Sequence, residues 1–319
     1  MLSRVADALF WMSRYLERAE CVARLLDVCF HLELDLRGVL AGPTELHWTA
    51  LAAVLQEAVP PAGAAAPRAP QAVISNWLTF EADNPNSVMS CLGRARANAR
   101  SVRGAITSEM WRELNKLYLQ LADKEFSDRG RESPHEFYQA VEFGSHTFQG
   151  VCDATLTHDE GWQFIQLGKY LERAEKTLRV LDVQYHLLHG LNDPADLPLS
   201  ALQWAAVLRG CRAYEAYQGL YVGRVEPDHV VEFLLLHPEF PRSVRFSLEA
   251  AGRALTAIEG TVPRRQLSKA DRLLGRTLAD LRFGEVGQIL TGDVHAFLAG
   301  LLERCGQASR AVQDQYSLR

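Results

Sequence analysis

Two charged stripes with the same composition repeat along the chain, and their residue types are the ones most able to do chemistry. In each stripe an acid, an arginine, a second acid and a histidine are spaced four, three and four positions apart, which places them on one helix face. The stripes consist of Glu20, Arg24, Asp27 and His31, and of Glu175, Arg179, Asp182 and His186. They form either a solvated salt-bridge ladder, worth roughly a few tenths of a kcal/mol per pair, or a binding surface for a charged partner.

A second charged group precedes each stripe on the same predicted helix. It falls in a sector of the helix that is otherwise apolar, where an unpaired charge costs on the order of several kcal/mol to desolvate. The group therefore forms either an internal ion-pair network or the lining of a polar cleft. With the adjacent tyrosines, the candidate binding residues here are Arg14, Tyr15, Glu17 and Arg18, and Lys169, Tyr170, Glu172 and Arg173.

Glu17 and Glu172 are the candidate catalytic residues. A carboxylate serves as a general acid or base when its surroundings bring its pKa near the working pH. Arg18 or Arg173 would then hold a carboxylate or an acyl phosphate. An enzyme of acyl or amide transfer is thus the alternative to a binding protein.

A group of arginines occurs in the first half of the chain alone. Arg96, Arg100 and Arg103 share one helical face, called the arginine face below, and Arg94 lies close by in sequence. Guanidinium groups bind carboxylate or phosphate through two parallel hydrogen bonds, so the face fits an anionic ligand or an acidic partner surface. The alternative is that acids of the same protein neutralise these arginines.

Known catalytic and cofactor motifs are absent from the sequence. It has no phosphate-binding loop, no dinucleotide-binding glycine pattern and no nucleophile elbow. Asp27 with His31, and Asp182 with His186, have a spacing that could ligate a metal, but such helical pairs are more often salt bridges. We therefore expect no metal and no cofactor, and keep a metal-binding helical bundle as a minor alternative.

The elements that must position these residues are helices. Apolar residues recur with helical periodicity, residues 4–36 contain neither Gly nor Pro, and strand signals are missing. The dipeptide Asn84-Pro85 predicts a helix start, with Pro85 at the first helical position. The sequence therefore predicts an all-α protein built as a helical bundle.

An internal repeat organises the chain. Residues 15–32 (YLERAECVARLLDVCFHL) and 170–187 (YLERAEKTLRVLDVQYHL) are identical at 12 of 18 positions. These two segments are 155 positions apart. Weaker matches continue at a separation of 156 positions, such as Trp48 with Trp204 and Ser87 with Ser243. We interpret the chain as two copies of one helical unit, residues 1–156 and 157–319, packed as one helical body.

Composition limits the classes of partner. The 34 basic and 39 acidic residues give a net charge of −5, which argues against a nucleic-acid-binding protein. No apolar run is long enough for a membrane span, and the N-terminus does not resemble a signal peptide. Six scattered cysteines without a C-x-x-C pair are typical of reduced thiols, so a cytoplasmic location is expected.

Four segments carry a resemblance to a known family. MLSRVADALFWMSRYLERAE, NPNSVMSCLGRARANARSVR, EMWRELN and FIQLGKYLERAEKTLRVLDV resemble the bacterial alpha-E domain family over essentially the whole chain. The family usually shows Gly-Arg-Tyr-x-Glu-Arg-Ala; here Ser13 replaces the glycine of the first copy and Lys169 the arginine of the second, so the charge survives both changes.

The resemblance implies an all-α protein whose gene neighbours or fusion partners include a circularly permuted ATP-grasp protein and a transglutaminase-like peptidase. We therefore expect an accessory or binding subunit of an ATP-dependent system that modifies peptides by amide ligation. Its partners would be the ATP-grasp protein, a peptide substrate and the transglutaminase-like protein. ATP would be bound by the ATP-grasp partner, and not by this protein.

Overall fold

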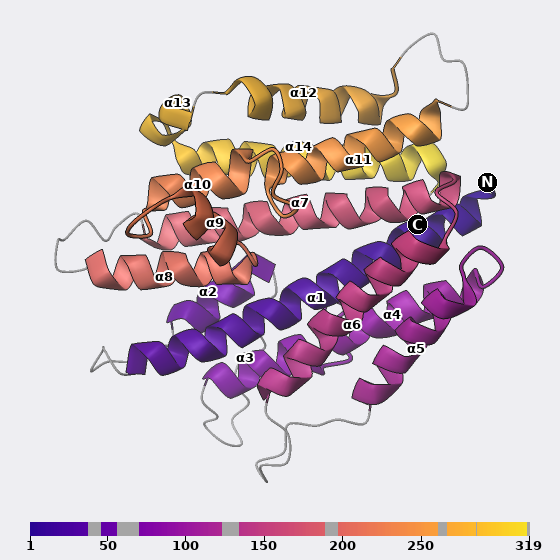
Figure 1. The fold of residues 1–319 in the computed structure, drawn as a ribbon, viewed down its shortest axis with the longest axis horizontal. Coiled ribbons are helices and arrows are strands. Elements are labelled where there is room, and N and C mark those ends of the chain that lie inside the picture. The colour runs from indigo at the N-terminus through magenta and orange to yellow at the C-terminus, as the bar shows by residue number, and fades with distance from the viewer. Residues whose placement is uncertain are drawn as a thin grey trace. The chain divides into compact units, whose positions relative to one another are not determined.

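The computed structural model describes residues 1–37, 46–55, 70–122, 134–188, 197–260, 267–284 and 286–317. These residues form α-helices and the turns between them, without a β-strand among them (Figure 1). The prediction of an all-α helical protein is confirmed.

The chain divides into two compact units. The first consists of residues 1–52 and 56–169, and the second of residues 53–55 and 170–319. The division lies within helix α7, whereas the boundary expected between the two sequence copies lies between residues 156 and 157. The duplication itself stays a prediction from the sequence.

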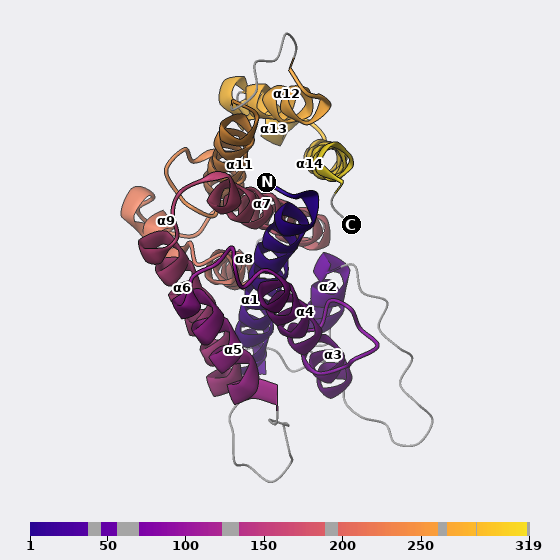
Figure 2. The same cartoon turned by 90° about the vertical axis from the view of Figure 1, so that its right-hand side faces the viewer.

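Helix α1 is the centre of the first unit. It packs against α4 and α6, and α5 lies against both α4 and α6 (Figure 2). Because α1 contains neither Gly nor Pro, it runs without a break for 35 residues. The helices of this unit are α1 (Ser3–Arg37), most of α2 (Leu46–Leu55), α3 (Pro70–Thr79), α4 (Val88–Ser101), α5 (Ser108–Ala122), α6 (Pro134–Thr155) and the first turns of α7 (Glu160–Leu188).

Helix α4 begins later than the sequence predicts. The Asn84 side chain accepts a hydrogen bond from the Asn86 backbone N–H at 2.8 Å, which holds residues 84–86 in a turn. Ser87 is the N-cap, and its hydroxyl accepts from the Ser90 N–H at 3.2 Å. The expected start at Asn84-Pro85 is therefore wrong, because the Asn side chain stabilises a turn rather than capping the helix.

The first turns of α7 lie directly on α1. Gly168 faces the backbone carbonyl of Phe10 and the hydroxyl of Ser13, and a Cβ atom at this position would overlap both oxygens. A close approach of two helix backbones at this point requires glycine. This contact positions Lys169, the next residue, beside the site described below.

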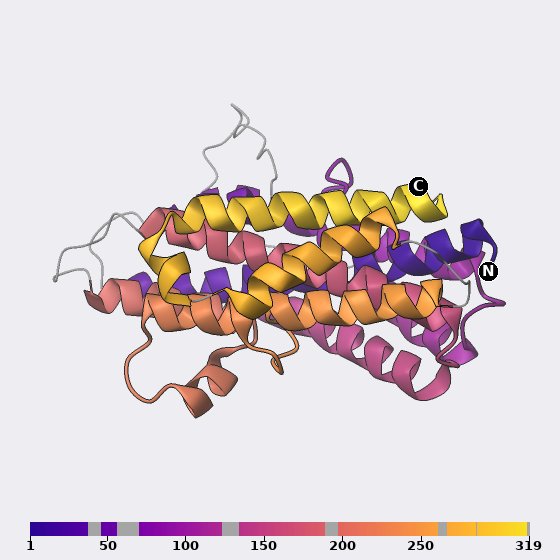
Figure 3. The ribbon, with the colours of Figure 1, turned by 90° about the horizontal axis from the view of Figure 1, so that it is seen from above.

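The second unit is also a helical assembly. Its α12 packs against α11 and α14, and α10 packs against α8 and α11 (Figure 3). The rest of α7 joins this unit, since Tyr170 packs edge-on against Phe246 with ring centroids 5.9 Å apart. The remaining helices are α8 (Leu197–Gly210), α9 (Tyr214–Leu220), α10 (Pro227–Leu236), α11 (Val244–Glu259), α12 (Lys269–Phe283), α13 (Val286–Thr291) and α14 (Val294–Tyr316).

Candidate functional site

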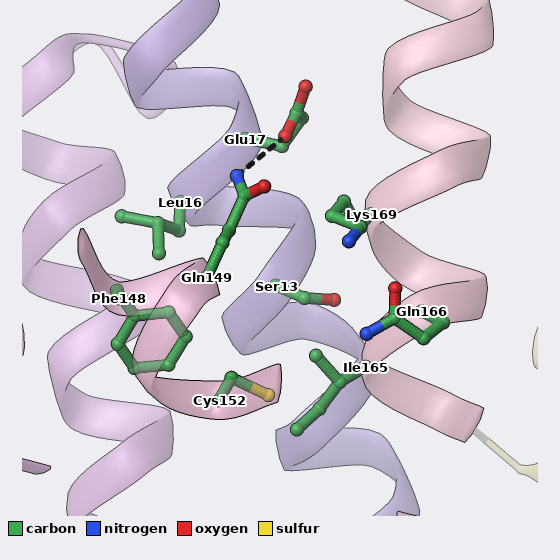
Figure 4. Close-up of a pocket in the computed structure, with 9 residues that line it drawn as sticks. All are labelled: Ser13, Leu16, Glu17, Phe148, Gln149, Cys152, Ile165, Gln166 and Lys169. Carbon is green, nitrogen blue, oxygen red and sulfur yellow. Dashed lines mark hydrogen bonds between the residues drawn. The ribbon is translucent and has the colours of Figure 1, made fainter. Parts of the chain in front are cut away.

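A small pocket in the first unit contains one of the two candidate catalytic residues. Helices α1 and α6 and the first turns of α7 supply its walls, and its empty space is about 310 Å³, open solvent included. Glu17 is 1% exposed, and the Gln149 amide donates a hydrogen bond to its carboxylate at 3.3 Å (Figure 4). The pocket is lined by Ser13, Leu16, Glu17, Phe148, Gln149, Cys152, Ile165, Gln166 and Lys169.

The pocket holds an acid, a base and a thiol. Lys169 lies on the α7 side and Glu17 on the α1 side (Figure 4). Burial raises the pKa of the Cys152 thiol to about 11, although the charge of Lys169 acts in the opposite direction. At neutral pH this thiol is protonated and a poor nucleophile, so carboxylate and amine are the groups with catalytic capacity here.

The other candidates next to Glu17 do not line this pocket. The guanidinium of Arg14 is buried and lies over the rings of Phe10 and Trp11, 5.6 and 5.2 Å from their centroids. Arg18 donates a hydrogen bond to the Asn86 side chain at 2.6 Å. The first charged group is therefore partly structural, and Glu17 alone of it faces the pocket.

Glu20 and Arg24 form a buried ion pair on α1. The Arg24 Nε lies 3.1 Å from one carboxylate oxygen of Glu20, and a second guanidinium nitrogen lies 3.4 Å from the other. His146 of α6 approaches the same carboxylate to 3.8 Å. Glu20 is 0% and Arg24 4% exposed, so a solvated ladder is wrong for these two residues.

Asp27 and His31 continue the stripe and meet a residue that sequence reasoning missed. The His135 ring at the start of α6 lies 2.6 Å from the Asp27 carboxylate, and His31 lies 3.7 Å from it. Neither spacing nor periodicity connects residues 27 and 135. A weak signal did exist, because His135 and His295 both occur in the pattern His-x-Phe at a helix start.

The second unit repeats part of this arrangement. Asp182 of α7 lies 2.6 Å from His295 of α14. Glu175 of α7 lies close enough to Cys305 of α14 for its charge to affect the thiol. Burial raises the pKa of Cys305 to about 12, and the negative charge of Glu175 contributes to this increase. Arg179 is half-buried, and the side chain of His186 lies outside the part of the chain that the structure describes.

The remaining predicted residues of this unit make structural contacts. Glu172 is 1% exposed and pairs with Lys176 at 4.0 Å. Arg173 donates to the Pro241 carbonyl at 3.3 Å and lies over the Tyr170 ring. Glu172 therefore has an ion-pair partner within its own helix.

The arginine face lies on α4 beside aromatic residues of α5. Arg96 lies 4.9 Å from the Tyr118 ring centroid and donates to the Asn115 side chain at 2.8 Å. Arg103 lies 5.2 Å from the Trp111 ring centroid. Cations over aromatic faces gain on the order of 0.5–1 kcal/mol at exposed sites, which orders these long side chains.

No acid of the described residues pairs with the arginine face. Arg100 and Arg103 are exposed and Arg96 is half-buried, and salt bridges within the described ranges involve other arginines. Arg94 likewise lies over the Tyr15 ring, at 5.6 Å, and no acid in the described ranges pairs with it; the Arg18 guanidinium lies over the same ring at 5.7 Å. In the part of the chain that the structure describes, the arginine face is therefore not neutralised by acids of the same protein.

The chain belongs to the Alpha-E family, a predicted α-helical domain with a conserved ER motif, whose model matches residues 1–316. Both repeated segments contain a Glu-Arg pair, Glu17-Arg18 and Glu172-Arg173. The chain is 25% identical over 331 aligned positions to uncharacterized proteins of Mycobacterium bovis and Mycobacterium tuberculosis. The match covers 98% of this chain but 36% of each relative, so the chain spans about a third of their length.

Two further findings complete the comparison. No solved structure matches this chain. Among the described helices, none has the length and apolar character needed to cross a membrane.

Proposed function

We propose that this protein is a binding subunit of an ATP-dependent peptide-modifying system, and that its arginine face binds an amide ligase of the ATP-grasp type or the peptide substrate of that ligase. The observation that carries the proposal is the arginine face itself. The guanidinium groups of Arg96 and Arg103 lie over aromatic rings, and no acid of the described residues pairs with the face. Such a surface is suited to carboxylate or phosphate groups of a partner.

The family resemblance supports the choice of partner. It associates alpha-E proteins with circularly permuted ATP-grasp proteins, and an amide ligase acts on carboxylates that it activates with ATP. Acidic peptide substrates and acyl phosphates both carry the groups that arginine binds best.

The test is association with a circularly permuted ATP-grasp protein of the same organism, measured by co-purification and by isothermal titration calorimetry. The variant R100E/R103E reverses two exposed charges and leaves the contacts of Arg96 with Tyr118 intact. We expect its affinity to fall by more than about tenfold, since like charges across an interface cost several kcal/mol.

The matched control is R272E/R276E, which makes the same charge change at two exposed positions of α12 in the second unit. The control is expected to bind like the original protein. Calorimetry with acidic candidate peptides is done in the same way, and equal affinity of R100E/R103E and the unchanged protein for both the ligase and the peptides refutes the proposal. ATP consumption and the mass change of candidate peptides, followed with and without each component, then identify the reaction.

The pocket at Glu17 favours a second candidate function, an acid–base enzyme of acyl or amide transfer. Glu17 and Lys169 face one small space. In that case E17Q abolishes turnover while the circular dichroism spectrum and partner binding stay unchanged. E172Q serves as the comparison, because Glu172 makes its ion pair elsewhere, with Lys176.

A further inference from the structure

Asp27, His31 and His135 form a cluster of metal-ligating side chains where α6 begins against α1. One ligand atom of each residue lies within 4.8 Å of the other two. The sequence alone offers two of these ligands, four positions apart on α1, and we therefore expected no metal. The fold adds the third from a helix more than 100 residues further along the chain.

Hydrogen bonds prepare two of the three side chains for coordination. The Nδ1 of His31 lies 2.8 Å from the backbone carbonyl of Asp27, so it donates its proton there and leaves the Nε2 lone pair available. Ligating histidines usually hold their second nitrogen in this way. The Nδ1 of His135 and the Asp27 carboxylate lie 2.6 Å apart and share one proton. Two ligand atoms of a tetrahedral zinc site, each about 2.0–2.1 Å from the ion, lie about 3.3 Å from each other. A zinc ion therefore replaces the shared proton after a small increase in the distance between Nδ1 of His135 and the Asp27 carboxylate.

The charge of Asp27 also favours a cation. Its side chain is 11% exposed, and no lysine or arginine of the described residues pairs with it. A buried carboxylate needs a positive partner, which at this site is either a protonated imidazole or a bound cation. The two histidine rings are 55% and 41% exposed, so a metal ion has access from solvent.

The second unit carries the same pair. Asp182 lies 155 positions after Asp27, and its carboxylate is 2.6 Å from His295, which is the second residue of α14 as His135 is of α6. The distance and the placement on the helix agree in both units. The Asp–His pair is therefore a feature of both units, whereas a third ligand is seen in the first unit alone among the described residues.

We propose that Asp27, His31 and His135 bind a divalent first-row transition metal ion. Two imidazoles and one carboxylate are the set found in catalytic zinc sites and in non-haem iron sites, and three protein ligands leave coordination positions open for water or for an anionic group of a ligand. The site is independent of the arginine face, so either proposal stands or fails alone.

The test is titration of the full chain, freed of metal by chelation, with Co²⁺ and Zn²⁺. Cobalt absorption bands report coordination geometry, and calorimetry with Zn²⁺ gives affinity and stoichiometry. The starting protein is H295A, which removes the equivalent pair of the second unit and leaves the proposed site intact. On this background we compare H135A and D27N.

The matched control on the same background is H158A. His158 is an exposed histidine with an acid, Asp153, 3.8 Å away, and it lies outside the three-ligand cluster. Circular dichroism verifies that each variant folds.

We expect H295A and H295A/H158A to bind one zinc ion each with similar affinity. H295A/H135A and H295A/D27N should bind at least about 100-fold more weakly, beyond the 10–100-fold typical of changes to residues that only orient a ligand. Absence of metal binding by H295A overturns the proposal. Equal binding by H295A and H295A/H135A overturns it as well, because the metal then lies elsewhere.

Discussion

Replacing Arg24 by methionine is expected to lower the free energy of unfolding by about 3–5 kcal/mol. Methionine keeps an unbranched apolar stem of similar shape but removes the guanidinium. Glu20, which is 0% exposed, then keeps its charge in a buried position without the Arg24 guanidinium.

The magnitude follows from the geometry of the pair. At a separation of 3.1 Å and an effective dielectric constant of about 20, two unit charges attract by roughly 5 kcal/mol. His146, 3.8 Å from the same carboxylate, remains in the variant and offsets part of the loss. The expected loss therefore lies toward the lower end of the range.

The assay is urea unfolding at pH 7 followed by circular dichroism. Since the chain has two units, hydrogen exchange of the α1 amides assigns the change to the first unit. The control is R112M, which breaks the surface pair of Arg112 and Glu113 at 3.6 Å, with Arg112 66% exposed. Its effect should stay below about 1 kcal/mol.

A third variant separates charge from packing. In E20Q/R24M the buried group is a neutral amide, so part of the stability lost in R24M should return. The reasoning is refuted if R24M loses no more stability than R112M. It is also refuted if E20Q/R24M is no more stable than R24M.

Three further outcomes test the fold and its titrating groups. G168A should lose about 1–3 kcal/mol in urea unfolding, because a Cβ overlaps the backbone of α1, whereas Gly150→Ala, where a Cβ meets nothing, should not lose stability. Burial raises the pKa of Glu249, but hydrogen bonds from Arg282 and Arg245 outweigh it and lower the pKa below 4.5. The ionised Glu249 therefore stabilises the fold above pH 4.5, and this stabilisation is lost as the pH falls through the lowered pKa. E249Q should flatten the dependence of the melting temperature on pH in that range. Cys305, whose pKa is raised to about 12 by burial, should react with iodoacetamide at pH 8 only after unfolding. Peptide mapping assigns the label, and fast labelling of Cys305 in the folded chain would contradict this.

The fold class and part of the candidate site can be predicted from the sequence. Helical periodicity and the lack of Gly and Pro in residues 4–36 predict α1, and the spacing of Glu20 and Arg24 predicts their pairing. Both are local properties, since residues four apart on a helix are neighbours whatever the rest of the chain does. Burial is not local: the same spacing describes a solvated ladder until α6 covers the pair.

Contacts between distant residues explain what the sequence could not predict. His135 reaches Asp27 because α6 starts against α1, and Gln149 reaches Glu17 by the same packing. The helix start at Ser87 could not be predicted for a local reason. An Asn side chain can either cap a helix or close a turn, and Asn84 closes a turn.

The sequence by itself determines an all-helical chain, two segments with identical charged residue types, and an arginine face on one helix. Helix periodicity and side-chain spacing are enough for these. Only the tertiary structure decides which charges are functional candidates. It buries the Glu20–Arg24 pair, leaves the arginine face without an acid among the described residues, and brings His135 to Asp27 and His31. The physical reason is that burial and ligand geometry depend on how separate helices pack, which the residue pattern within one helix does not specify.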